Sequence, residues 1–179
     1  MTEYVALLYS IVLGQGRRLV MAELRELAAE LGLGRPRTLV ATGNLVFEAE
    51  GTDARALEAK LEPAFAARFG KHVDIVVRDA AAWRRVVAGN PFPDAAAERP
   101  QRLTVRVMRA PLDASVVDRL ERYRGEGERM ALVEGDLWLD LPHGVATSRL
   151  FGATTPARIG IGTFRNWNTV RRLGEMLDG

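Results

Sequence analysis

The chain contains no cysteine and only two histidines among its 179 residues. Without cysteine it can form no disulfide, no thiolate nucleophile and no sulfur-ligated zinc site. No window approaches the ~20 consecutive apolar residues that a membrane helix needs. The first residues, Met1 to Tyr4, include an acidic side chain and lack the basic start of a secretory signal. We therefore expect a soluble, cytoplasmic protein with no membrane partner.

The composition supports a folded core and a nearly balanced charge. Apolar residues make up 47% and charged residues 27%, which argues against global disorder. The net charge of +2 arises near the end, because residues 141–179 carry five basic and two acidic side chains. Such asymmetry can mark an anionic partner. Arginine also outnumbers lysine 23 to 2 in an alanine-rich chain, so compositional bias explains the excess equally well.

Hydrophobic periodicity and turn residues predict the elements of the first half. Gly14-Gln15-Gly16 and Thr42-Gly43-Asn44 are typical of turns, and Asp53 is a suitable helix cap. The order is β-α-β-β-α-β, the split βαβ arrangement of a ferredoxin-like subdomain over residues 1–80. We expect strands at 4–13, 38–41, 45–48 and 73–77, and helices at 21–32 and 53–69.

The second half, residues 81–179, predicts a smaller α+β subdomain packed with the first. Its terminal helix is indicated by an apolar stripe that includes Trp167 and Val170. The fold class is therefore α+β. We expect helices at 80–88 and 113–123, strands at 103–108, 129–133 and 137–141, a polar connector at 94–100 and a loop at 143–162.

The strongest candidate for ligand contact lies before the terminal helix. Gly160-Ile161-Gly162 leading into a helix would present free amides and a positive dipole end to an anion. Gly162 and Thr163 would lie at this start, where Arg165 adds a bidentate cation and Asn166 can contact the ligand. In the competing interpretation Asn166 caps the helix and the glycines only shape the loop. The stretch is neither a P-loop nor a dinucleotide fingerprint, so we expect no cofactor.

Two further groups of candidate residues lie in the first half. Arg17 and Arg18 precede a predicted helix, where their charge opposes the helix dipole, so a phosphate partner or simple solvent exposure would explain them. Thr42 and Asn44 flank the predicted turn, which is most simply structural. Neither His72 nor His143 has a neighbour at metal-ligand spacing, so we expect no metal site. No catalytic motif is present, so catalytic residues are not assigned and enzymatic activity stays open.

These residues also carry a family resemblance that extends over essentially the whole chain. Thr42-Gly43-Asn44 and the run from Thr163 to Thr169 (Thr-Phe-Arg-Asn-Trp-Asn-Thr) resemble the bacterial domain-of-unknown-function 1697 family. Met21-Ala22-Glu23-Leu24 and the Asn90-Pro91-Phe92 turn agree with it. The resemblance implies a two-part α+β fold with a ferredoxin-like first half, and it implies no established activity.

The chain departs from that family at residues 9–15. The family pattern there is Arg-Gly-Ile-Asn-Val-Gly-Gly, so its arginine falls on Tyr9 and its first glycine on Ser10. Its asparagine falls on Val12 and its last glycine on Gln15. If this segment lines the family's site, the chain has lost a cation there.

Three functions fit these observations. The first is a binder of an anionic, phosphorylated small molecule. The second is a nucleic-acid-binding module, although the strands lack the stacking aromatics of RNA-recognition sheets. The third is an enzyme that acts by electrostatic positioning through Arg165 and Asn166. We expect the first.

Overall fold

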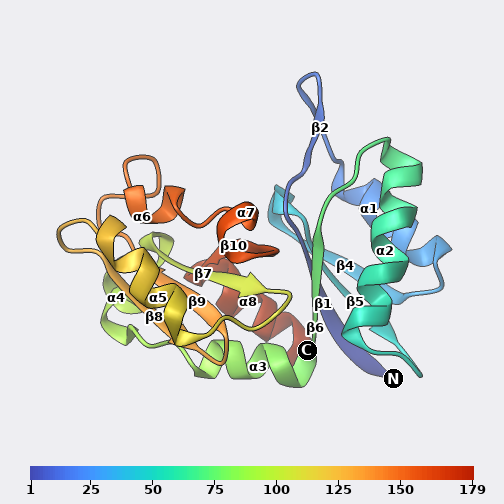
Figure 1. Cartoon of the computed structure of the whole chain (residues 1–179). Helices are drawn as coiled ribbons and strands as arrows, with labels where there is room; N and C mark the ends of the chain where they lie inside the picture. The colour runs from blue at the N-terminus through green and yellow to red at the C-terminus, as the bar shows by residue number, and fades with distance from the viewer. The chain divides into compact units, whose positions relative to one another are not determined.

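The computed structural model describes residues 1–179, which form two compact units (Figure 1). The first unit comprises residues 1–85 and 172–179, and the second comprises residues 86–171. The boundaries fall within α3 (Ala80–Ala88) and α8 (Trp167–Asp178). That the sequence-predicted halves, 1–80 and 81–179, each form a subdomain stays a prediction. None of the helices combines the length and the apolar character needed to cross a membrane.

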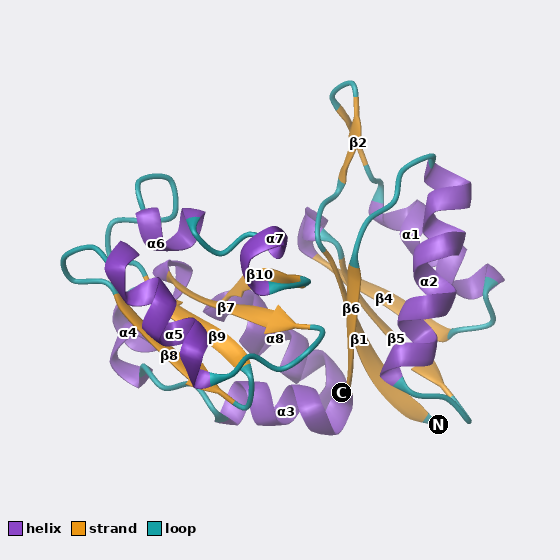
Figure 2. Ribbon diagram, in the orientation of Figure 1, coloured by secondary structure: helices purple, strands orange, loops and turns teal.

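The first unit is built on a four-stranded antiparallel sheet with the strand order β4-β5-β1-β6. Figure 2 shows α1 and α2 side by side next to this sheet. The predicted β-α-β-β-α-β order is present, and the strand order is consistent with the ferredoxin-like interpretation. The elements are β1 (Thr2–Leu8), β2 (Val12–Gly14), β3 (Arg17–Arg18), α1 (Met21–Glu30), β4 (Gly34–Leu39), a 3-10 turn (Val40–Thr42), β5 (Asn44–Ala49), α2 (Ala54–Phe69) and β6 (Ile75–Asp79).

The core of the first unit explains these elements. Leucine and phenylalanine side chains of α2 are buried against the sheet, among them Leu61 and Phe65. Asp53 begins α2 by accepting a hydrogen bond from the Ala56 amide at 2.9 Å, as predicted. Gly70 ends the helix in the left-handed conformation.

Two predicted strands of the first unit are wrong in extent. The strand expected at 38–41 is β4 (Gly34–Leu39), and Val40–Thr42 form a 3-10 turn. The apolar run at 4–13 was expected to form a single strand, but β1 ends at Leu8. The amide of Leu8 donates to Gly43 O and that of Tyr9 to Asp74 O at the end of the sheet. Beyond this point the chain forms a separate hairpin of β2 and β3, because the glycines at its tip adopt positive φ.

The second unit contains an antiparallel sheet with the strand order β10-β7-β9-β8. Leu137, Leu139 and Leu150 belong to its buried apolar cluster. The α+β class predicted from the sequence is confirmed. The elements are α4 (Pro93–Glu98), a 3-10 turn (Pro100–Arg102), β7 (Leu103–Met108), α5 (Ala114–Leu120), a 3-10 turn (Glu121–Tyr123), β8 (Arg129–Val133), β9 (Asp136–Asp140), α6 (Arg149–Gly152), α7 (Pro156–Ile159) and β10 (Gly162–Asn166).

Three predictions for the second unit are corrected. The polar connector at 94–100 contains α4, and the loop at 143–162 contains α6 and α7. Pro93 and Pro156 each stand in the first turn of a short helix, where their fixed φ favours helix and no amide is lost. The stretch expected to lead directly into the terminal helix is instead strand β10, whose backbone groups pair with β7.

Candidate functional site

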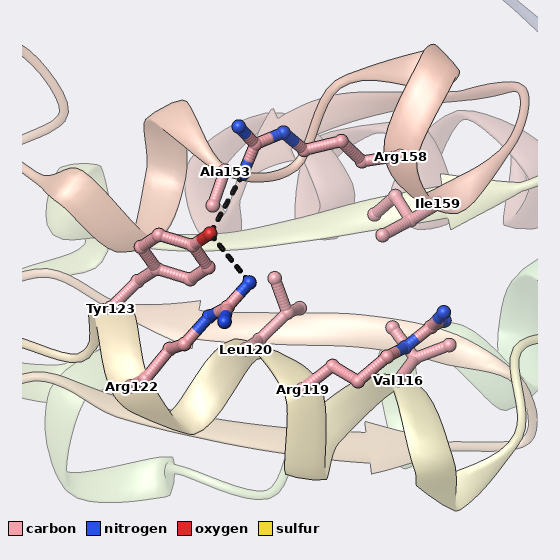
Figure 3. Close-up of a pocket in the computed structure, with 8 residues that line it drawn as sticks. All are labelled: Val116, Arg119, Leu120, Arg122, Tyr123, Ala153, Arg158 and Ile159. Carbon is pink, nitrogen blue, oxygen red and sulfur yellow. Dashed lines mark hydrogen bonds between the residues drawn. The ribbon is translucent and has the colours of Figure 1, made fainter.

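A pocket of about 260 Å³ lies on the second unit, where α5 and its following 3-10 turn face α6 and α7 (Figure 3). Apolar and cationic side chains line it together. We call it the Tyr123 pocket. Its lining residues are Val116, Arg119, Leu120, Arg122, Tyr123, Ala153, Arg158 and Ile159.

The hydroxyl of Tyr123 is the polar centre of the pocket. It accepts one hydrogen bond from Arg122 Nη2 at 3.0 Å and another from Arg158 Nη1 at 3.1 Å. Both guanidiniums also lie over the Tyr123 ring, with Cζ 4.9 Å and 5.6 Å from its centroid. Because a phenol oxygen has two lone pairs, these bonds occupy both of them and leave its proton for a further acceptor.

The two arginines that contact Tyr123 are exposed and form no ion pair with a carboxylate. Arg124, close by in the sequence, does form one, with Glu121 at 2.6 Å. Each guanidinium carries five N–H donors, of which only one is used in each case. The pocket therefore has unneutralised positive charge and spare donors.

The arginines also alter the acidity of Tyr123. The hydrogen bond from Arg158 has the largest effect and lowers the pKa of the Tyr123 hydroxyl. Burial raises this pKa, and the hydrogen bond from Arg122 lowers it again, so the net shift is downward. Nearby positive charge favours the phenolate because it stabilises the negative oxygen.

The floor of the pocket is apolar. Val116, Leu120, Ala153 and Ile159 are all buried, and they belong to the apolar cluster of the second unit. The combination of an apolar floor with a few placed polar groups is typical of small-molecule sites. At about 260 Å³ the cavity is slightly smaller than the ~300 Å³ lower end for such sites, so it suits a small ligand.

The residues predicted before the terminal helix lie elsewhere in the second unit. Gly162, Thr163, Arg165 and Asn166 are part of β10, so the expected free amides pair with β7. Arg165 is buried and donates to Thr163 Oγ1 at 2.8 Å and to Phe164 O at 2.7 Å. Burial lowers the pKa of its guanidinium to about 10, so it stays charged at neutral pH. Contact of these residues with a ligand stays a prediction.

Asn166 performs the capping role considered as the alternative. Its Oδ1 accepts a hydrogen bond from the Thr169 amide at 3.1 Å, and α8 begins at the next residue, Trp167. The Trp167 ring lies 6.0 Å from the ring of Trp138, centroid to centroid. Both contacts are structural.

The candidate residues of the first unit form two separate groups. Asn44 is fully buried and donates to Leu39 O at 3.0 Å and to Thr42 Oγ1 at 2.7 Å, which holds the predicted turn. Arg17 and Arg18 are exposed on β3, and Arg17 donates to Phe69 O at 3.2 Å. A ligand role for these four residues stays a prediction.

The segment that departs from the family pattern lies at the end of β1 and in the β2–β3 hairpin. Tyr9 and Val12, which stand where the family has arginine and asparagine, are 47% and 44% exposed. The tip carries Gln15 at a φ of 50°. These replacements therefore change an exposed surface and leave the core of the first unit unaltered.

Sequence reasoning missed the Tyr123 pocket. The only local signal is the close spacing of Arg119, Arg122 and Tyr123 at the end of the predicted helix 113–123. Arg158 is 35 residues further along the chain, within a stretch expected to be a loop. No spacing rule joins these residues before the fold brings them together.

Comparison with known proteins agrees with the fold. A solved structure described as that of the conserved bacterial protein SP0830 from Streptococcus pneumoniae matches with a TM-score of 0.74 and 23% identity, over 98% of each chain. Comparison with curated proteins found no match. The family described as "Protein of unknown function (DUF1697)" matches residues 1–138. The chain therefore belongs to this family of unknown function.

Proposed function

We propose that the protein is a cytoplasmic binder of a small phosphorylated molecule, which it holds in the Tyr123 pocket. The observation that carries the proposal is the pair of arginines that converge on the Tyr123 hydroxyl without a carboxylate partner. An anion placed there would satisfy donors that now face solvent. Nucleic-acid binding and catalysis by positioning, the other two hypotheses, have no comparable site to support them.

A phosphomonoester suits the donor set. Arginine binds phosphate oxygens through two parallel N–H groups, and the bonds are stronger when both partners are charged. Arg122 and Arg158 supply two such forks, and the proton of the Tyr123 hydroxyl supplies one further donor. A phosphoryl group has three terminal oxygens to accept them.

Isothermal titration calorimetry with phenyl phosphate tests the proposal. A hydrogen bond between charged groups contributes about 1.5–3 kcal/mol, so Arg158→Met should weaken binding by at least about tenfold. The matched control is Arg124→Met, which removes an exposed arginine of the same unit that does not line the pocket. Binding that is equally weak in both variants, or absent in the unaltered protein, would refute the proposal.

A further inference from the structure

The Tyr123 pocket has a second cationic end. Figure 3 shows that the Arg119 side chain extends past Val116, so that its guanidinium lies away from the Tyr123 hydroxyl. Arg119 is exposed and makes no hydrogen bond or ion pair within 4.0 Å. Its charge does lower the pKa of Asp113, but less than the hydrogen bonds from Ser115 do.

The two ends are separate in Figure 3. The Tyr123 hydroxyl accepts its hydrogen bonds from Arg122 and Arg158, and no hydrogen bond joins it to Arg119. Between the ends lies the apolar floor, which includes Leu120 and Ile159. The pocket is therefore cationic, then apolar, then cationic along its length.

We propose that the natural ligand carries two anionic groups joined by a short apolar body. This inference rests on the proposed function of the same pocket. The phosphoryl group occupies the Arg122–Tyr123–Arg158 end, the apolar body lies on the floor, and a second anion, such as a carboxylate, reaches Arg119. Each part of the lining then meets a group of matching chemistry.

This arrangement determines which ligands are preferred. A second charge-assisted hydrogen bond contributes about 1.5–3 kcal/mol, which corresponds to roughly 10–150-fold in affinity. Exposure of Arg119 to water and salt places the expected gain at the lower end of that range, about tenfold. A single-anion ligand of the same body gains nothing from Arg119.

The test compares 4-carboxyphenyl phosphate with phenyl phosphate by isothermal titration calorimetry, on the full chain and on Arg119→Met. The unaltered protein should bind the carboxylated probe about tenfold more tightly. Arg119→Met should abolish this preference, because it weakens binding of the carboxylated probe more than that of phenyl phosphate, and the control Arg124→Met should retain both values.

The outcomes separate the two proposals. Equal affinity of the unaltered protein for the two probes would overturn the two-anion inference and leave the proposed function standing. An equal loss of both probes in Arg119→Met would overturn it too, since Arg119 would then belong to the phosphate end. Failure of both probes to bind the unaltered protein would overturn the proposed function itself.

Discussion

Replacing Asp140 by asparagine should destabilise the second unit strongly. The Asp140 carboxylate is fully buried on β9 and accepts three hydrogen bonds from two arginines. Arg99 Nε donates to Oδ1 at 2.9 Å and Arg99 Nη2 to Oδ2 at 2.7 Å, while Arg129 Nε donates to Oδ2 at 2.9 Å. Asparagine removes the negative charge and places an NH₂ group where one of these donors points.

The size of the effect follows from the burial of the partners. Removing one partner of a buried ion pair costs about 3–5 kcal/mol, because the other charge stays desolvated. The side chains of Arg99 and Arg129 are 26% and 38% exposed, so water takes over part of their solvation. We therefore expect a loss of about 2–3 kcal/mol, against a total stability of about 5–15 kcal/mol for a typical protein.

Urea unfolding measures this loss. With a slope of about 2 kcal/mol/M, the midpoint of Asp140→Asn should fall by about 1 M. The control is Asp94→Asn, because Asp94 is 53% exposed and accepts one hydrogen bond from Arg129 at 2.8 Å. Its midpoint should change far less, because an exposed ion pair contributes little to stability. Equal midpoints for the two variants would refute the reasoning.

The same carboxylate predicts how stability depends on pH. Burial raises the pKa of Asp140, but the hydrogen bonds from Arg99 and Arg129 outweigh it and hold the pKa below its usual value. A carboxyl group with a lowered folded pKa contributes its stability fully above the unfolded value of about 3.9 and loses it as pH falls through the folded pKa. Asp140→Asn should therefore lose less stability than the unaltered protein on acidification below about pH 5.

Three further predictions concern individual residues. Gly43→Ala should lower the free energy of unfolding, measured in urea, by about 2–4 kcal/mol, because φ is +83° and the new Cβ would lie 2.8 Å from Leu8 Cβ. The control Gly70→Ala also has a positive φ, +74°, but its Cβ would meet open space, so it should cost only about 1 kcal/mol. Asp53→Ala should cost about 1 kcal/mol by loss of the cap on α2, measured in the same way. The affinity for phenyl phosphate should fall as pH rises toward 10. The pKa of the Tyr123 hydroxyl is lowered, so the hydroxyl ionises in this range and the resulting phenolate repels the anion. Calorimetry of Tyr123→Phe should show no such fall.

The elements with strong local signals could be predicted from the sequence. Helix α2 was placed correctly because Asp53 supplies a cap and Leu57, Leu61 and Phe65 repeat every four residues. Gly43 supplies the left-handed conformation that the predicted turn between β4 and β5 needs, although β4 ends at Leu39, two residues earlier than expected. In these segments local preference and tertiary packing agree.

The predictions failed where tertiary pairing decides the structure. The glycines before the terminal helix favoured a loop, but pairing with β7 draws Gly162–Asn166 into a strand and buries Arg165. The Tyr123 pocket depends on Arg158 meeting Tyr123 across 35 residues. Neither the pairing of β10 with β7 nor the contact between Arg158 and Tyr123 produces a periodic pattern in the sequence, because each joins segments that are distant along the chain.

Amide NMR titration of the full chain with phenyl phosphate tests the central claim most directly, since it locates the bound anion. Binding in the Tyr123 pocket predicts that the largest and earliest shifts occur in the 3-10 turn Glu121–Tyr123 and in α7 (Pro156–Ile159). Shifts concentrated instead in β10 or in the β2–β3 hairpin, or no shifts at millimolar phenyl phosphate, would contradict the claim.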